Sequence, residues 1–313
     1  MKTKNFFNNS KPLKFKLSNG YTVYLHYLTV VGSTLHGLNT SSNGDFDLKG
    51  VFSYETDLLL GLNDLPEQFD KNSMEGEDRL ELLKLVFNHP TLNLKNQLET
   101  LKQTEQLHNV DLSFFNDEQS FLEKQDLDLF EAKKFFLNTF KHDSNMFDML
   151  FARNVSNGKF VLFSSKQFDE LLLSENQKLF FDLVLLDNFN SAYKRFRGMG
   201  FNTFKLGKKN KSSKDLAKSL QSLYLLKNMF TSKTFYPRLK TEQNNTVLKV
   251  KSFQVDETLL YNELVEFVDN ERVKLENELL VLFNDFQSNH NNSDLNYNTV
   301  FNLLNKLLLK LRK

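Results

Sequence analysis

Cysteine, tryptophan and isoleucine are all absent from the 313 residues of the chain. Without cysteine, disulfides and thiolate metal ligands are excluded, so we expect a reducing compartment, either the cytoplasm or the mitochondrial matrix. The Lys-rich amino-terminal residues lack the apolar core of a secretory signal, and secretion is not expected. The abundance of Phe, Leu, Asn and Lys suits coding by an AT-rich genome, which leaves the missing isoleucine unexplained.

Long apolar runs and a strong excess of charge are missing as well. No run approaches the roughly 18 uninterrupted apolar residues of a membrane span, so no membrane role is expected. The net charge of only +1 does not indicate a nucleic-acid binder. The charge is uneven, however, because no acidic residue precedes Asp45 and residues 205–214 are Lys-rich. Two interpretations stay open for these basic segments: a solvated tail and loop, or a local contact with RNA or an acidic partner.

The first half of the chain alternates strand and helix patterns. Residues 14–31 predict a pair of strands that turns at Asn19-Gly20, which is a strong hairpin signal. Helical spacing recurs downstream at 51–62, 78–87, 94–110 and 120–140, whereas residues 146–152 and 159–164 are predicted strands. Together these elements predict a first α+β domain at residues 1–165.

The second half repeats this mixture. Helical patterns cover residues 168–189, 215–229, 259–286 and 297–313, and the alternation of Val247, Lys249 and Lys251 with apolar neighbours predicts a strand at 245–255. A second α+β domain is therefore predicted at residues 166–313. The expected fold class is α+β, with two related halves that each contain a mixed or antiparallel sheet covered by helices.

Several segments carry a resemblance to a known family. Lys16–Leu25 has a Leu-x-Asn-Gly-x-x-Val pattern, Gly50–Gly61 encloses a short polar centre in an apolar run, and two paired helices follow at 80–90 and 94–111. A helix and an Asn-Met turn at 135–146 and an Arg-containing segment at 190–204 complete the order. In this order the chain resembles the pitrilysin/insulinase-type zinc peptidases, which include mitochondrial processing peptidase and the core subunits of complex III. The resemblance implies that the two halves form one subunit of a clam-shell chamber.

The residues that this family uses for chemistry are not reproduced. Aligned without gaps from Gly50, the family's His-x-x-Glu-His positions fall on Ser53, Thr56 and Asp57, so neither the zinc-binding imidazoles nor the general base is present. Glu105 stands alone at the distal ligand position. The resemblance therefore implies a degenerate site at 50–61, without metal or other cofactor and without hydrolase activity.

The segment 190–204 is the candidate for a contact with a partner or a peptide. It contains Arg195 and Arg197, while the position of the family's substrate-binding Tyr falls on Thr203 or Phe204. Elsewhere, the six His residues show no metal-ligand spacing. No combination of acid, base and nucleophile is visible in the sequence.

Two functions follow as hypotheses. The first is a catalytically inactive peptidase-like subunit that pairs with a similar chain to form or stabilise a processing-peptidase chamber. The alternative is a structural subunit of a large assembly, such as complex III or a mitochondrial ribosome, with its Lys-rich segments in contact with RNA.

Overall fold

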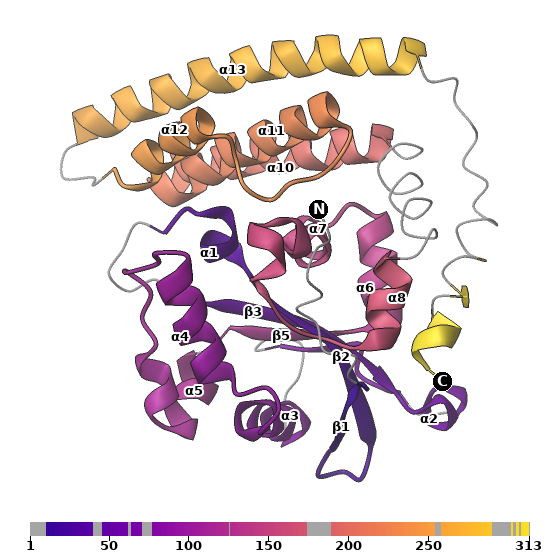
Figure 1. Cartoon of the computed structure of the whole chain (residues 1–313). Helices are drawn as coiled ribbons and strands as arrows, with labels where there is room; N and C mark the ends of the chain where they lie inside the picture. The colour runs from indigo at the N-terminus through magenta and orange to yellow at the C-terminus, as the bar shows by residue number, and fades with distance from the viewer. Residues whose placement is uncertain are drawn as a thin grey trace.

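A mixed sheet of six strands occupies the first half of the chain, and a group of long helices follows it (Figure 1). The computed structural model describes residues 11–39, 46–61, 64–70, 77–124, 126–173, 189–253, 258–289, 302, 305, 306 and 308–312. The strands are β1 (Leu13–Lys16), β2 (Thr22–Val31), β3 (Asp47–Tyr54), β4 (Gln68–Phe69), β5 (Leu127–Glu131) and β6 (Val161–Ser164). The helices around the sheet are α1 (Gly32–His36), α2 (Thr56–Leu60), α3 (Glu77–Asn88), α4 (Leu94–Thr104), α5 (Glu118–Lys124), α6 (Ala132–Phe140), α7 (Ser144–Phe151) and α8 (Lys166–Leu173). The later helices are α10 (Phe189–Asn210), α11 (Ser213–Ser232), α12 (Thr241–Lys251) and α13 (Thr258–Asn289).

The predicted hairpin at the start of the chain is confirmed. Strand β1 pairs antiparallel with β2, with Phe15 opposite Val23. Gly20 has φ +86, a conformation that glycine adopts without steric cost, and the Asn19 side chain accepts a hydrogen bond from the Tyr21 amide at 2.9 Å. The sheet then runs β1-β2-β3-β5-β4, while β6 also pairs with β2.

The helix predicted at residues 51–62 is wrong. Residues up to Tyr54 form β3, a central strand that is antiparallel to β2 and parallel to β5, and only the short α2 follows it. A strand covered on both faces loses the polar–apolar alternation, and a short apolar run of this kind suits a helix equally well. Gly50 is required here because a Cβ would lie 2.6 Å from Leu129 Cδ2 and 2.7 Å from the Tyr27 carbonyl oxygen.

Two further elements of the first half differ from the predictions. The single helix expected at 120–140 is interrupted by β5, and the Glu131 side chain at the end of this strand caps α6 by accepting from the Lys133 amide. The strand expected at 146–152 is α7, which begins after Asp143, whose carboxylate accepts from the Asn145 amide. An N-cap of this type initiates a helix whatever the apolar content of the residues that follow.

The strand predicted at 245–255 is also wrong, because this segment is α12. Val247 and Val250 are both fully buried and lie three residues apart, so they share one face of a helix. Over 189–253 and 258–289 the structure contains helices and no strand, so the sheet expected in the second half is not found in these residues.

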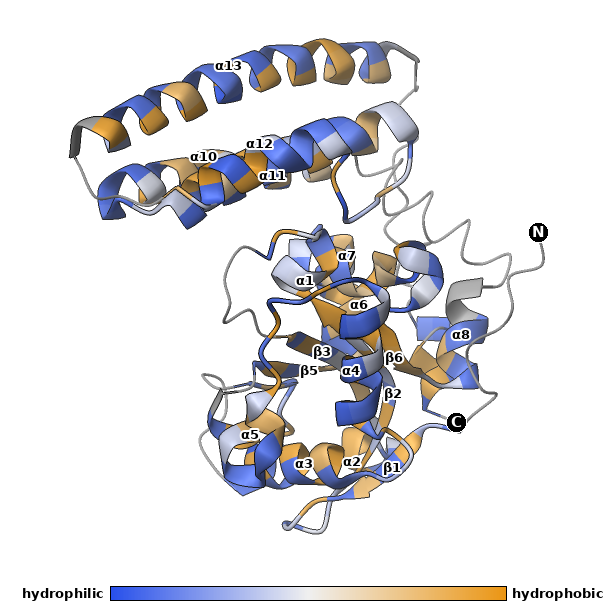
Figure 2. Ribbon diagram, turned by 60° about the vertical axis from the view of Figure 1, so that its left-hand side comes forward, coloured by the Kyte–Doolittle hydropathy of each residue, from blue (hydrophilic) through white to orange (hydrophobic). Residues whose placement is uncertain are grey.

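Helices α10–α13 of the second half pack together, and we call them the helical bundle. Helix α10 lies close against α11: a Cβ on Gly200 would be 3.0 Å from Leu223, and one on Gly207 would be 2.7 Å from Leu216. Helix α13 covers α11, and hydrophobic and hydrophilic residues alternate along its length (Figure 2). Among the helices described, none combines the length and the apolar character needed to span a membrane.

Candidate functional site

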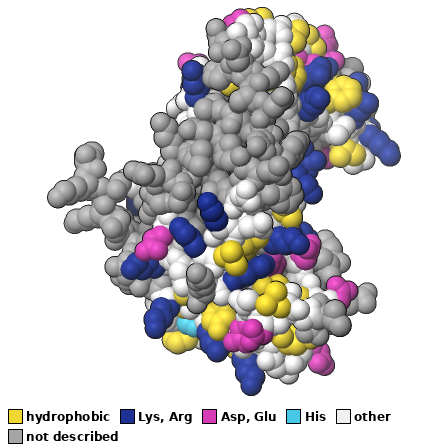
Figure 3. Space-filling model, turned by 90° about the vertical axis from the view of Figure 1, so that its right-hand side faces the viewer, with side chains coloured by type: hydrophobic (Ala, Val, Ile, Leu, Met, Phe, Trp, Pro, Cys, Tyr) yellow, Lys and Arg dark blue, Asp and Glu magenta, His cyan; other side chains and the backbone are white. Residues whose placement is uncertain are grey.

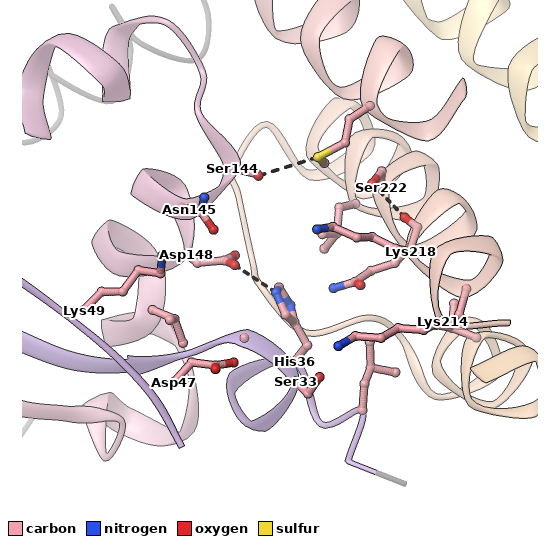
Figure 4. Close-up of a pocket in the computed structure, with 18 of the residues that line it drawn as sticks. Ser33, His36, Asp47, Lys49, Ser144, Asn145, Asp148, Lys214, Lys218 and Ser222 are labelled. Atoms are coloured by element: carbon pink, nitrogen blue, oxygen red, sulfur yellow. Dashed lines mark hydrogen bonds and ion pairs between the residues drawn. The ribbon is translucent and has the colours of Figure 1, made fainter. Parts of the chain in front are cut away.

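A cleft lies between the carboxyl end of β2 and α1 on one side and the helical bundle on the other. Its volume is about 460 Å³, within the usual range for sites that hold small molecules. The sheet side contributes α1, the first residues of β3 and β5, and α7, while α10, α11 and α12 form the opposite wall. All of the side chains labelled in Figure 4 are polar or charged.

A buried ion pair joins α1 to α7 on the sheet side of the cleft, and its histidine also bonds to the segment after α11. The ring of His36 donates from Nε2 to Asp148 Oδ2 at 2.9 Å and from Nδ1 to the carbonyl oxygen of Pro237 at 2.6 Å. With Asp148 ionised both partners are acceptors, and this geometry suits a ring that carries both protons. Burial opposes this charge, but the Asp148 carboxylate and the two hydrogen bonds outweigh burial and raise the pKa of His36 above its usual value.

Three lysines of the bundle also line the cleft. Lys214 and Lys218 extend from α11 toward the wall that holds His36 and Asp148 (Figure 4). Lys251 of α12 donates to the Leu38 carbonyl at 2.6 Å and to Ser33 Oγ at 3.0 Å. Its pKa is lowered by burial and, to a smaller degree, by the nearby Lys214 ammonium.

Acidic residues balance these lysines. Asp47 lies directly against Gly32, where a Cβ would be only 1.8 Å from its Oδ2, and the backbone of this glycine has φ +65. Lys49 and Asp128 form an ion pair of 2.7 Å at the same end of the cleft. The cleft therefore presents both signs of charge, and its polar groups fit a small polar molecule better than an apolar one.

The arrangement gives no support for acid–base or nucleophilic chemistry. Neither ring nitrogen of His36 is free to take a proton from a substrate, since both donate to protein acceptors. Ser33 accepts from Lys251, and Ser222 donates to the Lys218 carbonyl at 2.8 Å. We therefore interpret these groups as structural: His36 and Lys251 connect the sheet side to the bundle side, whereas Lys49 and Asp128 pair within the sheet.

The residues predicted as a degenerate zinc site lie apart from this cleft. Ser53 on β3 is buried and lies 2.9 Å from Nε2 of His26, whose other ring nitrogen is 3.4 Å from Ser165 Oγ. Burial lowers the pKa of His26 to about 3, so this ring is neutral at physiological pH. Because all three side chains are buried, these contacts connect β2, β3 and the residue just before α8.

Thr56 and Asp57 lie on α2 and are exposed. The hydroxyl of Thr56 donates to the Arg312 carbonyl at 3.0 Å, and the Arg312 guanidinium pairs with the buried Glu131 at 3.0 Å. These contacts bring the carboxyl end of the chain back to the sheet. Asp57 makes no contact with Ser53 or Glu105 that would create a metal site.

Glu105 belongs to a different part of the surface. It accepts from Ser156 Oγ at 2.9 Å and pairs with Lys159 and Arg238, each at 3.5 Å. Arg238 in turn donates to the Leu35 carbonyl at 2.9 Å, so Glu105 helps to fix the segment after α11 against the sheet. Within the described part of the chain, no group of three or more His, Asp or Glu residues is placed to hold a metal ion.

The three residues predicted to contact a partner separate in the structure. Arg195 and Arg197 are exposed on α10 and make long ion pairs with Asp143 and Glu276, at 3.6 and 3.7 Å. Phe204 is buried, and the guanidinium of Arg272 lies 5.0 Å from its ring centre. Phe204 therefore belongs to the core of the bundle and offers no surface to a partner.

His36, Asp148 and Lys251 were not identified as neighbours from the sequence. About a hundred residues separate each of them from the next, and no spacing rule connects them. Comparison with family models, curated proteins and solved structures finds no match to this chain.

Proposed function

We propose that the chain is a non-catalytic subunit of a larger protein assembly. The observation that carries the proposal is the outer face of α13. Large apolar side chains on this helix are 42 to 60% exposed: Leu260, Phe267, Val273, Leu280 and Val281. Exposed apolar groups gathered on one element are typical of surfaces that a protein partner covers.

The spacing of these side chains supports a helical partner. Leu260 and Phe267 are seven residues apart, as are Val273 and Leu280, so each pair lies on one side of the helix. Phe267 and Val273 are six residues apart, a turn of about 240°, so the two pairs lie on different sides of the exposed surface. The inner face of α13 is already used, because Tyr261, Leu264 and Val268 are buried. The apolar residues of the outer face are therefore additional to those that the bundle itself needs.

The pairing of polar groups inside the chain is consistent with a structural role. His26, His36 and Glu105, which have the side-chain chemistry for catalysis or metal binding, each make contacts that connect separate elements. An active site usually leaves at least one such group available to the substrate.

A peptidase-like subunit remains a more specific form of this proposal. It is supported by the order of the sequence segments that resemble the zinc peptidases, and it would make the partner a similar chain that completes a clam-shell chamber. The alternative partner is a large assembly such as complex III or a mitochondrial ribosome, which the basic segments support.

The test is purification of the full chain from its source and identification of the neighbouring subunit. We expect a complex that the double substitution Phe267→Glu/Val281→Glu dissociates. The matched control, Leu60→Glu/Leu80→Glu, removes exposed apolar side chains outside the bundle and should leave the complex intact. The proposal would be overturned if the chain is monomeric in the native extract, or if the control substitutions dissociate the complex to the same extent. One zinc per chain that is lost in Glu105→Gln would overturn its non-catalytic part.

A further inference from the structure

Helix α10 carries charge of one sign only. Its 22 residues include six Lys or Arg and no Asp or Glu, and Lys211 follows directly. All six cationic side chains are exposed: Lys194, Arg195, Arg197, Lys205, Lys208 and Lys209. On the face drawn in Figure 3, Lys and Arg side chains lie among hydrophobic ones on the helical part of the molecule. Such a helix attracts a polyanion.

The cationic side chains of α10 make only weak contacts within the chain. Arg195 and Arg197 are 61 and 51% exposed, and their ion pairs of 3.6 and 3.7 Å are of the kind that contributes little in water. Lys205 and Lys208 make no ion pair with any residue that the structure describes, and each lies over an aromatic ring of the same helix. All four can therefore turn to an external anion at low cost.

The positive groups form two clusters with an uncharged interval between them. The first cluster ends at Arg197 and the second begins at Lys205, eight residues or roughly 12 Å further along the helix. The exposed residues of the interval are Phe201 and Asn202, and Gly198 is partly exposed. The basic stripe is the name we give to both clusters and this interval, residues 194–209.

Gly198 is the informative residue of the interval. The other two glycines of α10 are needed for packing against α11, but a Cβ on Gly198 would meet nothing within 4 Å. A glycine in an exposed helix interior costs about 1 kcal/mol relative to alanine. The packing of the fold does not require this glycine, and its missing side chain leaves the backbone of α10 open to close approach from outside the chain.

We propose that the basic stripe binds double-helical RNA, with α10 lying across the minor groove. The minor groove of an RNA duplex is wide and shallow, so it is recognised by contacts to phosphates and 2′-hydroxyls. The two cationic clusters contact the phosphates of the two strands. Gly198 lets the helix backbone approach the groove, and the amide of Asn202 reaches the 2′-hydroxyls. This proposal goes beyond the subunit proposal, which depends on α13.

An acidic protein is a weaker fit to the same stripe. Protein interfaces place apolar anchors at their centre, whereas the centre of this stripe is a glycine and an asparagine beside Phe201, which is 40% exposed. Single-stranded RNA would need several aromatic platforms for successive bases, and Phe201 is the single exposed aromatic ring on the described α10.

The experiment measures binding of the full chain to a fluorescent RNA duplex of about 20 base pairs as a function of salt. We expect Lys205→Glu/Lys208→Glu to weaken binding by at least about tenfold and to lower the slope of log K against log salt by about 2, one unit for each lost phosphate contact. The matched control is Lys95→Glu/Lys133→Glu, which makes the same change of charge at exposed helical positions beside the sheet. It should bind nearly as tightly as the unaltered chain.

Two further measurements can refute the proposal. Gly198→Gln changes no charge, and we expect it to weaken duplex binding severalfold while the circular dichroism spectrum stays unchanged. Competition with single-stranded RNA, duplex DNA of the same sequence and polyglutamate identifies the preferred polyanion. The proposal would be overturned if the control pair loses as much affinity for the duplex, if Gly198→Gln binds with unchanged affinity, or if any competitor binds more tightly. The α13 variants test the subunit proposal separately.

Discussion

His36 connects the sheet to the segment after α11 through the Pro237 carbonyl, and its ion pair with Asp148 of α7 holds the ring in place, so loss of His36 should weaken the attachment of the bundle. The side chains of His36 and Asp148 are 8% and 11% exposed, and His36 lies where the segment after α11 meets α1. Replacement of His36 by leucine leaves the Asp148 carboxylate buried without its partner, which typically costs about 3–5 kcal/mol. Asp148→Asn keeps a hydrogen-bond acceptor for the ring and should cost about 1.5–3 kcal/mol, the usual value of a hydrogen bond to a charged group.

The pair also makes the stability depend on pH. The pKa of His36 is raised in the folded chain, so its contribution is complete below the unfolded value of 6.5 and is lost as the pH rises through the folded pKa. The coupling energy of the pair is measured by urea unfolding, followed by circular dichroism at pH 6 and pH 9. The measurement compares the unaltered chain with the two single variants and the double variant. We expect this coupling to be favourable at pH 6 and much smaller at pH 9.

Two results would refute this reasoning. The first is a coupling energy that does not change between the two pH values. The second is an NMR spectrum in which the His36 ring is neutral at pH 6, since the geometry of its two acceptors suits a ring that carries both protons. His26→Gln serves as the control for the NMR measurement, because it removes the signal of an imidazole ring that stays neutral in the folded chain.

Further predictions concern single positions. With a folded pKa near 3 against 6.5 when unfolded, His26 should make the chain lose stability as the pH falls from 6.5 toward 3, and acid unfolding of His26→Gln should show a shallower loss. Gly50→Ala should cost about 1–3 kcal/mol in urea unfolding because its Cβ meets β2 and β5, whereas Gly198→Ala should add about 1 kcal/mol. Glu131→Gln should release the Arg312 guanidinium and lower the unfolding free energy by about 1–3 kcal/mol, and faster carboxypeptidase digestion from the carboxyl end would check it.

The elements that could be predicted from the sequence are those with strong local signals. The hairpin follows from Asn19-Gly20, and helices α3, α11 and α13 follow from apolar residues at helical spacing. Strand β3 and helix α12 could not be predicted, because the same short apolar pattern is compatible with either structure and the choice depends on neighbours elsewhere in the chain. For β3 these neighbours are Tyr27 and Leu129, which leave no room for a side chain at Gly50.

The cleft was beyond prediction for a related reason. His36 and Asp148 are 112 residues apart, and the Pro237 carbonyl is a further 89 residues away from Asp148. Nothing in the local sequence of any of these residues indicates the others. Only the docking of the bundle on α1 and α7 brings them together.

The net charge of the chain averages over helices of opposite sign. Helix α10 has six basic residues and no acidic one, while α13 has seven acidic residues against two basic ones, so their charges of +6 and −5 almost cancel. Charges more than about 8 Å away are largely screened at physiological salt, so a polyanion responds mainly to the charges nearest to it. Of the acidic residues of α13, Glu276 lies 3.7 Å from Arg197 and offsets part of the charge of α10. A whole-chain charge of +1 is therefore compatible with a surface that binds RNA. The salt dependence of binding, and not the isoelectric point, is the measurement that decides it.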